Sequence, residues 1–267
     1  MLGIGAVAAT VAEAVSEPHR ISFERVDVPI QGLDPAFDGY RIAVVSDWHL
    51  PRRITAERLR EIFQQAFEFQ PDLVVAPGDL CDEKGGGPVP DFAGVFDGLS
   101  CPDGFYAVLG NHDHWWDAGR LRLNLAKATP FLLLDQKHIQ LRRRGASIAL
   151  GGVGDLWTDV CDPVATFRGV PDDVPRILLS HNPDVAEDRV WPVRVDLQIS
   201  GHTHGGEVCW WPGRALKVPS KHGGKFRAGL VEGRSHRVYV SRGITSPRGV
   251  RFLCPPEVTW MTLRASA

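Results

Sequence analysis

The stretch Ser200-Gly201-His202-Thr203-His204-Gly205-Gly206 follows an apolar run, residues 195–199, that is typical of a buried strand. The glycines on both sides allow a tight turn. Two histidines one residue apart in an extended turn point in different directions, so they can offer one nitrogen to each of two neighbouring cations. Taken alone, the pair is explained equally well as a polar turn with two solvated imidazoles.

Four other apolar runs end in residues that can bind a metal ion. Short apolar, β-branched runs predict buried strands, and in open α/β sheets chemistry gathers at the carboxyl ends of the strands. The side chains at these ends are therefore expected to meet at one edge of a sheet. They are Asp47 and His49, then Asp79, then Asn111, His112 and Asp113, and finally His181.

The intervening segments predict an α/β protein. Residues 21–30 alternate apolar and polar side chains, which favours an edge strand. Thr55 can cap a helix that ends before Pro71, residues 119–128 have helical spacing, and residues 91–99 are expected to form a short helix. Beyond residue 130 the chain is poorer in helix and richer in strands.

Length and composition favour one folding unit. The 267 residues are 43% hydrophobic, which supports a sizeable core, and candidate ligands spread over residues 47–204 place that stretch in one folding unit. We therefore expect a single domain over residues 21–267. The net charge of −2 argues against the coating of bulk nucleic acid. The five cysteines form no C-x-x-C pair and are expected to be reduced.

The N-terminus leaves three interpretations open. Residues 2–15 are apolar and rich in alanine, but they contain Glu13, lack a basic leader and are too short to span a bilayer. Residues 1–20 can be the remnant of a signal or an anchor, a helix that touches a membrane, or an ordinary N-terminal helix. Peripheral contact with a membrane is therefore one expectation among these.

Seven side chains form the candidate ligand set of a metal centre. Oxygen and imidazole ligands without a thiolate suit two divalent ions of Mn, Fe, Zn, Ni or Co, with one carboxylate bridging them. Because only two ligands are anionic, the centre keeps a charge of about +2, which suits a phosphate ester and acidifies a bound water. Each residue alone could be a turn, a cap or a core residue, but clustered ligand types mark a site. The ligands are Asp47, His49, Asp79, Asn111, His181, His202 and His204.

The order of these motifs resembles the calcineurin-like metallophosphoesterase superfamily. The late segments Tyr239–Ile244, Arg251-Phe252 and Cys254–Glu257 are similar to a bacterial branch of small, membrane-associated phosphodiesterases. The resemblance implies the metallo-dependent phosphatase fold, a four-layer α/β/β/α sandwich with mixed sheets. It leaves a membrane-associated and a cytoplasmic location in a bacterium both open.

The resemblance also implies roles for the motif residues. His112 would be the acid that protonates the leaving group, and Asp113 would orient it. A hydroxide that bridges the two cations would attack in line and break a P–O bond, without a covalent phosphoenzyme. One cation would be held by Asp47, His49 and His204, the other by Asn111, His181 and His202, with Asp79 bridging.

The expected substrate is a phosphodiester or a pyrophosphate, either a small molecule or linked to a lipid. Trp48, Arg52, His114 and Trp115 are candidate substrate contacts, because aromatic and cationic side chains can hold an organic group beside a phosphate. The tryptophans can equally fill the core. The resemblance offers one narrower alternative, a UDP-2,3-diacylglucosamine pyrophosphatase of lipid A synthesis. A non-catalytic scaffold with this fold is a second alternative, although such scaffolds usually lose the acid or several ligands.

Overall fold

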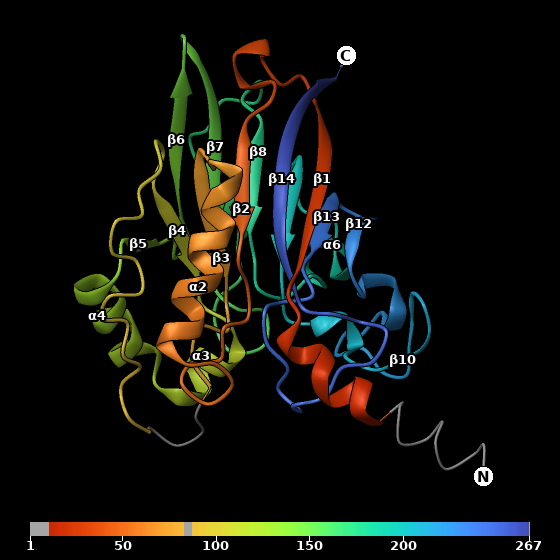
Figure 1. Ribbon diagram of the computed structural model, residues 1–267. Helices are drawn as coiled ribbons and strands as arrows, with labels where there is room; N and C mark the ends of the chain where they lie inside the picture. Colours follow the sequence, from red (N-terminus) through yellow and green to blue (C-terminus); the bar gives the residue numbers. More distant parts are fainter. Residues whose placement is uncertain (1–10, 83–86, 267) are drawn as a thin grey trace.

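Two six-stranded sheets face each other in the computed structural model, which describes residues 11–82 and 87–266 (Figure 1). The first sheet has the order β1 (Ser22–Gln31), β14 (Glu257–Ser266), β2 (Arg41–Val44), β3 (Leu73–Pro77), β4 (Phe105–Val108), β5 (Phe131–Leu133). The second has the order β12 (Gly229–Glu232), β13 (Arg237–Val240), β9 (Leu197–Ser200), β8 (Arg176–Leu179), β7 (Ala146–Gly152), β6 (Lys137–Arg143).

Both sheets are mixed, as expected. In the first, β2 to β5 are parallel and β14 runs antiparallel to β2. In the second, β13, β9, β8 and β7 are parallel, and both edge strands, β12 and β6, are antiparallel to their neighbours. Strand β1 is an edge strand, which confirms the expectation for residues 21–30. A separate hairpin pairs β10 (Cys209–Trp211) with β11 (Arg214–Ala215).

Apolar side chains fill the spaces between four layers. The inner strands β3, β8 and β9 are buried on both faces, which explains their mostly apolar sequences. In β2, Ile42 and Val44 pack between the sheets, whereas Ala43 faces the helices of the first outer layer. Those helices are α2 (Ala56–Ala66), α3 (Asn111–Trp116) and α4 (Ala118–Ala128); α5 (Pro163–Thr166) and α6 (Val185–Asp188) form the thinner outer layer on the second sheet. The predicted α/β/β/α sandwich is confirmed.

Short 3-10 turns complete the described elements. They are η1 (Glu17–His19), η2 (Pro35–Phe37), η3 (Phe67–Phe69), η4 (His204–Gly206) and η5 (Gly223–Phe226). Helix α2 begins as expected, because the Thr55 side chain accepts a hydrogen bond from the Arg58 N–H at 3.2 Å. None of the five cysteines, all of which lie among the described residues, forms a disulfide, which agrees with the expectation of reduced thiols.

The short helix expected at residues 91–99 is wrong, since this segment forms turns. Its two glycines, Gly94 and Gly98, have φ values of +71° and +77°, which no right-handed helix contains. The Asp91 carboxylate accepts a hydrogen bond from the Ala93 N–H at 2.9 Å and so closes a local turn instead.

Trp48 is a core residue, which corrects its assignment as a substrate contact. Its side chain is fully buried, and its ring meets Phe63 and Phe131 at centroid distances of 5.5 and 5.4 Å. The indole N–H donates to the Val45 carbonyl at 2.8 Å, so its polar atom is satisfied inside the protein. Trp48 therefore stabilises the first sheet against α2.

Substituting Trp48→Ala is expected to lower the free energy of unfolding by about 3–5 kcal/mol, because it leaves a large cavity in a packed core. Trp211→Ala is the matched control, since that indole is 63% exposed. Denaturant unfolding of the metal-loaded proteins measures both effects. Equal unfolding midpoints for the two variants would contradict the core assignment.

The described part of the N-terminus packs on the last loop before β14. Residues 11–16 are helical and continue into η1. The Arg251 N–H donates to the Ala14 carbonyl at 2.9 Å, and the Leu253 N–H donates to the Glu17 carboxylate at 3.0 Å. The expectation of an anchor or signal remnant at residues 1–20 lies partly outside the described residues. Among those described, no helix combines the length and the apolar character that a bilayer crossing needs.

Candidate metal centre

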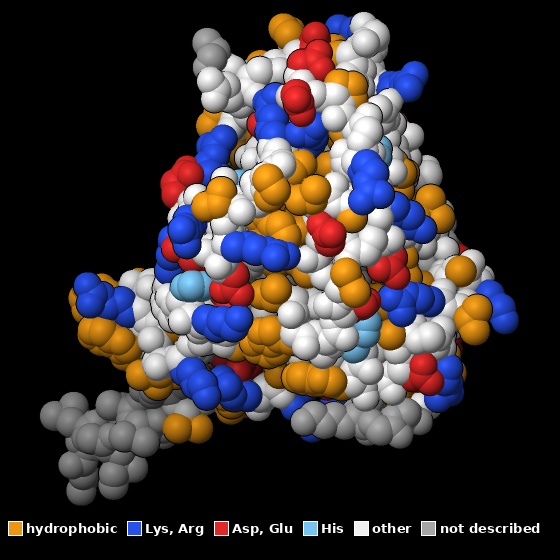
Figure 2. All heavy atoms as spheres, turned by 180° about the vertical axis from the view of Figure 1, so that it is seen from behind, with side chains coloured by type: hydrophobic (Ala, Val, Ile, Leu, Met, Phe, Trp, Pro, Cys, Tyr) orange, Lys and Arg blue, Asp and Glu red, His pale blue; other side chains and the backbone are white. Residues whose placement is uncertain are grey.

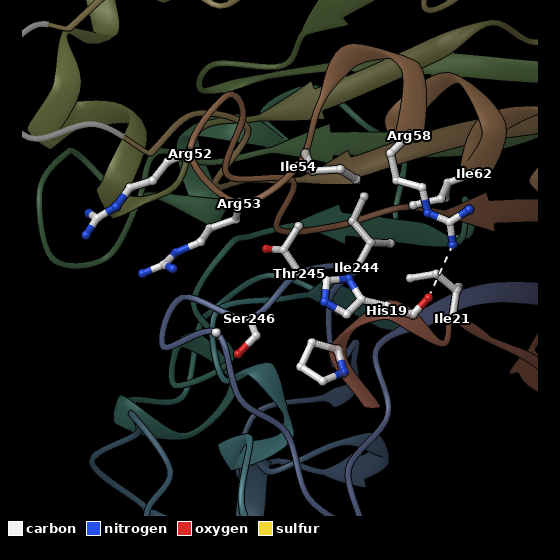
Figure 3. A pocket seen from close by; sticks show the side chains of 12 residues that line it. His19, Ile21, Arg52, Arg53, Ile54, Arg58, Ile62, Ile244, Thr245 and Ser246 are labelled. Carbon is white, nitrogen blue, oxygen red and sulfur yellow. Dashed lines mark hydrogen bonds between the residues drawn. The ribbon is translucent and has the colours of Figure 1, made fainter. Parts of the chain in front are cut away.

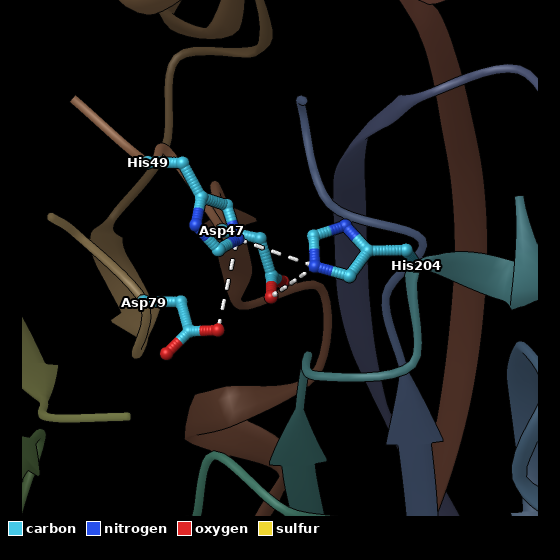
Figure 4. Close-up of side chains that lie close together, drawn as sticks. All are labelled: Asp47, His49, Asp79 and His204. Atoms are coloured by element: carbon cyan, nitrogen blue, oxygen red, sulfur yellow. Dashed lines mark hydrogen bonds and ion pairs between the residues drawn. The ribbon is translucent and has the colours of Figure 1, made fainter. Parts of the chain in front are cut away.

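Four of the seven candidate ligands form one tight group at the carboxyl ends of β2, β3 and β9 (Figure 4). Donor atoms of Asp47, His49, Asp79 and His204 all lie within 4.8 Å of one another. The Nε2 atom of His49 is 3.2 Å from His204 Nε2 and 3.6 Å from Asp79 Oδ2. His204 Nε2 is also 3.4 Å from Asp47 Oδ1.

A second group meets the first at Asp79. His181 Nε2 lies 3.2 Å from Asp79 Oδ2 and 3.2 Å from His202 Nδ1. Asn111 begins α3 and lines the same pocket as Asp79 and His202. Asp79 thus lies between the two histidine groups, which is where a carboxylate that bridges two cations has to be.

The backbone at the ligand positions is unusual. Five ligand residues have left-handed φ values, between +49° and +71°, although none is a glycine: they are Asp47, His49, Asp79, His202 and His204. Such conformations cost on the order of 1–3 kcal/mol each and are concentrated at functional sites. Glycines leave room for the crowded carboxylates: an ideal Cβ at Gly201 would lie 2.2 Å from Asp47 Oδ2, and one at Gly110 would lie 2.3 Å from Asp79 Oδ1.

The orientations of the imidazoles fit bound cations. The His181 Nδ1–H donates to the Pro77 carbonyl at 2.8 Å, which leaves Nε2 as the nitrogen that can bind a metal. His204 Nδ1 faces the Thr245 carbonyl at 3.3 Å, so its Nε2 is directed at His49. Among the described residues, the buried atoms Asp47 Oδ2 and Asn111 Oδ1 have no hydrogen-bond partner. Cations bound between these unpaired oxygen atoms and the histidine Nε2 atoms would give all of them a partner.

Protonation states also suit metal ligands. Burial lowers the pKa of His49 to about 4 and that of His202 to about 3, so both imidazoles are neutral near pH 7. Burial raises the pKa of Asp47 to about 6. Burial also opposes the charged forms of His181 and Asp79, but their mutual attraction outweighs it, raising the pKa of His181 and lowering that of Asp79. His181 carries a proton when no cation is bound, and a cation beside Asp79 would replace that proton.

His112 lies beside the ligands and is held by Asp82, a residue that the sequence analysis missed. His112 Nδ1 is 2.8 Å from Asp82 Oδ1, and the backbone N–H of His112 donates to Asp79 Oδ1 at 2.9 Å. Burial disfavours the imidazolium, but the hydrogen bond to Asp82 and the charge of Asp79 raise the pKa of His112. Asp82 Oδ2 is also 3.6 Å from His49 Nδ1, a distance that allows an ion pair but is too long for a hydrogen bond.

Asp113 has a different position from the one expected, and this corrects its role. Its carboxylate accepts hydrogen bonds of 2.8 Å from the backbone N–H groups of Gly110 and Cys81. Burial and the charge of Asp79 raise its pKa to about 7. Asp113 therefore fixes the turn that carries Asn111 and His112, whereas Asp82 orients the His112 ring.

A pocket of about 230 Å³ opens beside the ligands. Trp115 lines it, as expected of a substrate contact, and its ring is 4.8 Å from that of His112. Trp157 lines it too, against His202 at a centroid distance of 4.4 Å, although nothing in the sequence pattern singled it out. Arg248 also lines the pocket and is paired with Glu207 at 2.9 Å.

The structure does not bring the other two candidate substrate contacts into this pocket. His114 lies on α3 with its Nε2 atom 3.5 Å from Asp159 Oδ2. Arg52 lines a separate cavity and reaches Asp82 only at 3.9 Å. Both assignments are therefore corrected for the pocket at the metal ligands.

Comparisons with known proteins agree with this geometry. Residues 40–206 match the family described as Calcineurin-like phosphoesterase. The uncharacterized metallophosphoesterase YkuE of Bacillus subtilis is 30% identical over 94% of this chain and 88% of its own length. Phosphodiesterase YaeI of Escherichia coli is 28% identical over 84% of this chain and 82% of its own length. UDP-2,3-diacylglucosamine pyrophosphatase LpxG of Chlamydia muridarum is 26% identical over 92% of this chain and 90% of its own length.

Among solved structures, the 5'-nucleotidase precursor from Thermus thermophilus superimposes with a TM-score of 0.51 at 15% identity. The match covers 84% of this chain but only 54% of the nucleotidase chain. At this identity the likeness concerns the fold alone.

Proposed function

Because this chain belongs to the calcineurin-like phosphoesterase family and is a metal-dependent phosphoric ester hydrolase, we propose that it is a phosphodiesterase. The observation that carries the proposal is the position of His112, which lines the same pocket as the ligands Asp79 and His202. A phosphate ester releases an alkoxide, and an acid next to the reacting phosphate is what that leaving group needs. Among phosphate esters, a diester is favoured by the similarity to phosphodiesterase YaeI.

The seven ligand residues would hold two divalent cations, with Asp79 shared between them. When bound, such cations neutralise phosphate charge and supply a nucleophilic water near neutral pH. His112 would donate its Nε2 proton to the leaving oxygen, since Nδ1 is engaged with Asp82. Trp115 and Trp157 flank the pocket and would exclude water from it.

We further propose that the substrate is linked to a lipid, because an apolar hairpin projects beside the pocket. On β10, Trp210 and Trp211 are 59% and 63% exposed, and Leu216 beyond β11 is 69% exposed. Apolar and cationic side chains project together at the lower left of Figure 2, which after the half-turn corresponds to the lower right of Figure 1, where β10 lies. Tryptophan and arginine side by side suit the interface between a membrane and water, and the Arg214 guanidinium lies 5.7 Å from the Trp210 ring.

The hairpin is packed directly on a turn of the metal centre. The Leu216 N–H donates to the Val208 carbonyl at 2.9 Å, and an ideal Cβ at Gly206 would lie 2.4 Å from the Ala215 side chain. Gly206 itself lines the pocket with His204. Insertion of the hairpin into a lipid surface would therefore bring the pocket to that surface.

A UDP-2,3-diacylglucosamine pyrophosphatase is the narrower candidate, supported by the LpxG relatives and by the exposed hairpin. A non-catalytic scaffold is disfavoured, because His112 and all seven candidate ligands are present around Asp79.

Elemental analysis together with hydrolysis of bis(p-nitrophenyl) phosphate tests the proposed activity. We expect about two divalent ions per chain and faster turnover of this diester than of p-nitrophenyl phosphate. A fully metal-loaded protein that hydrolyses neither compound would contradict the phosphodiesterase proposal. Faster turnover of the monoester would instead indicate a phosphomonoesterase.

The double variant Trp210→Ser, Trp211→Ser tests the lipid-linked substrate. Hydrolysis of bis(p-nitrophenyl) phosphate in solution should be unchanged, whereas hydrolysis of UDP-2,3-diacylglucosamine in mixed micelles should fall about tenfold or more, a change of about 1.4 kcal/mol. Equal rates with the lipid would contradict a role of the hairpin. Absence of turnover with this lipid by the wild type would remove the pyrophosphatase candidate.

A further inference from the structure

A second cavity, of about 220 Å³, adjoins the metal centre and is lined by three arginines (Figure 3). It shares two segments with the centre. The Arg53 N–H donates to the His49 carbonyl, and Thr245, which lines the cavity, faces His204 through its carbonyl. Pro247 and Arg248 of the same loop line the metal pocket, while Ser246 and Gly249 line this cavity.

The positive charge in this cavity is poorly compensated. Its lining contains Arg52, Arg53 and Arg58 but no aspartate or glutamate among the described residues. Arg58 is paired with Glu61 at 2.7 Å, whereas Arg52 is 53% exposed and reaches Asp82 only at 3.9 Å. Within the part of the chain that the structure describes, the Nε atom of Arg53 is buried without a hydrogen-bond partner. A buried donor without an acceptor is destabilising, and an oxygen of a bound anion could accept its hydrogen bond.

Part of the remaining wall is apolar, although His19, Thr245 and Ser246 also line the cavity. Figure 3 shows Ile54 and Ile244 between the side of the cavity that carries Arg53 and the side that carries Arg58. Ile21 and Ile62 extend this surface. A free inorganic anion would leave that wall uncovered, whereas an anion attached to an apolar group would fill both parts.

We infer that this cavity binds a phosphate-class anion that carries an apolar group, at a site separate from the metal centre. An arginine fork matches the oxygens of a tetrahedral phosphate group, and the isoleucines match an alkyl or acyl chain. The inference requires no catalysis at the metal centre, so it can fail or succeed independently of the proposed phosphodiesterase activity.

Gly249 offers a way to block the site from within. An ideal Cβ at Gly249 would lie 3.7 Å from Arg53 Nη1, so the carboxylate of a Gly249→Asp variant would occupy the place of the anion. Gly249→Asn is the matched control, because it has the same shape and the same strain at φ +75° but no charge. Arg53→Gln removes the orphan donor without altering the turn.

Isothermal titration of the metal-loaded full-length protein with n-octylphosphonate, which cannot be hydrolysed, measures the site. We expect the wild type and Gly249→Asn to bind one more octylphosphonate per chain than Gly249→Asp and Arg53→Gln do. All four proteins should retain hydrolysis of bis(p-nitrophenyl) phosphate. Methylphosphonate should bind this site about tenfold or more weakly, because it lacks about seven methylenes of apolar surface.

Two results would overturn the inference. The first is equal stoichiometry in Gly249→Asp and Gly249→Asn, which would show that the cavity takes no anion. The second is equal affinity for methylphosphonate and octylphosphonate, which would show a simple anion site without an apolar part. Thermal unfolding of each variant checks that it is folded, and Arg53→Gln decides the question if both Gly249 variants are unfolded.

Discussion

Substituting Asp79→Asn is expected to empty at least one metal position and to lower kcat about a thousandfold or more, a change of about 4 kcal/mol. Asp79 Oδ2 lies 3.6 Å from His49 Nε2 and 3.2 Å from His181 Nε2, so it is the carboxylate that both ligand groups share. An amide has no charge to offset a divalent cation, and it leaves His181 without its anionic partner. Elemental analysis and steady-state kinetics measure the two effects.

Asp113→Asn is the matched control for this prediction. Asp113 is equally buried and lies in the adjoining turn, but its carboxylate is engaged with backbone N–H groups. We expect this variant to be less stable and yet to retain both cations. Full metal content and normal kcat in Asp79→Asn would contradict the bridging role, and so would equal metal loss in the two variants.

Substituting His112→Ala is expected to lower kcat about a hundredfold or more while the metal content is unchanged, as for the loss of a general acid. The loss should depend on the leaving group. An alkyl ester needs the proton most, whereas p-nitrophenolate leaves readily without it, so the variant should hydrolyse the aryl diester closer to the wild-type rate. A loss of equal size for alkyl and aryl esters would indicate that His112 positions the substrate instead.

Asp82→Asn separates the orientation of His112 from its chemistry. The Asp82 carboxylate helps to raise the pKa of His112, so its removal lowers that pKa. Since a general acid acts in its protonated form, activity in Asp82→Asn should decline at a lower pH than in the wild type. A pH profile that is unchanged in Asp82→Asn would contradict this role.

The clustering of the candidate metal ligands and most strands were predictable because their signals are local. Each ligand follows an apolar run within a few residues, and the runs place their ends at one edge of the sheets whatever the loops do. The role of Asp82 was not predictable in this way, because its partner His112 is 30 residues away along the chain. The turns at Gly94 and Gly98 show a further limit: helical spacing of apolar residues does not reveal left-handed glycines.

Trp48 illustrates how tertiary structure decides between two interpretations of one residue. It stands between Asp47 and His49, both of which face the metal centre. The Trp48 side chain is fully buried and points into the core. The residues on either side of it have a left-handed backbone, so strand alternation does not apply here, and the Phe63 and Phe131 rings that pack on the indole come from distant segments.

The left-handed backbone at the five ligand positions has a consequence for metal exchange. The strands before these turns are buried, so the turns are anchored in the two sheets. We therefore expect one divalent ion to replace another without any refolding of the loops. Which ion the protein carries is then governed by supply and by ligand chemistry rather than by conformational adjustment.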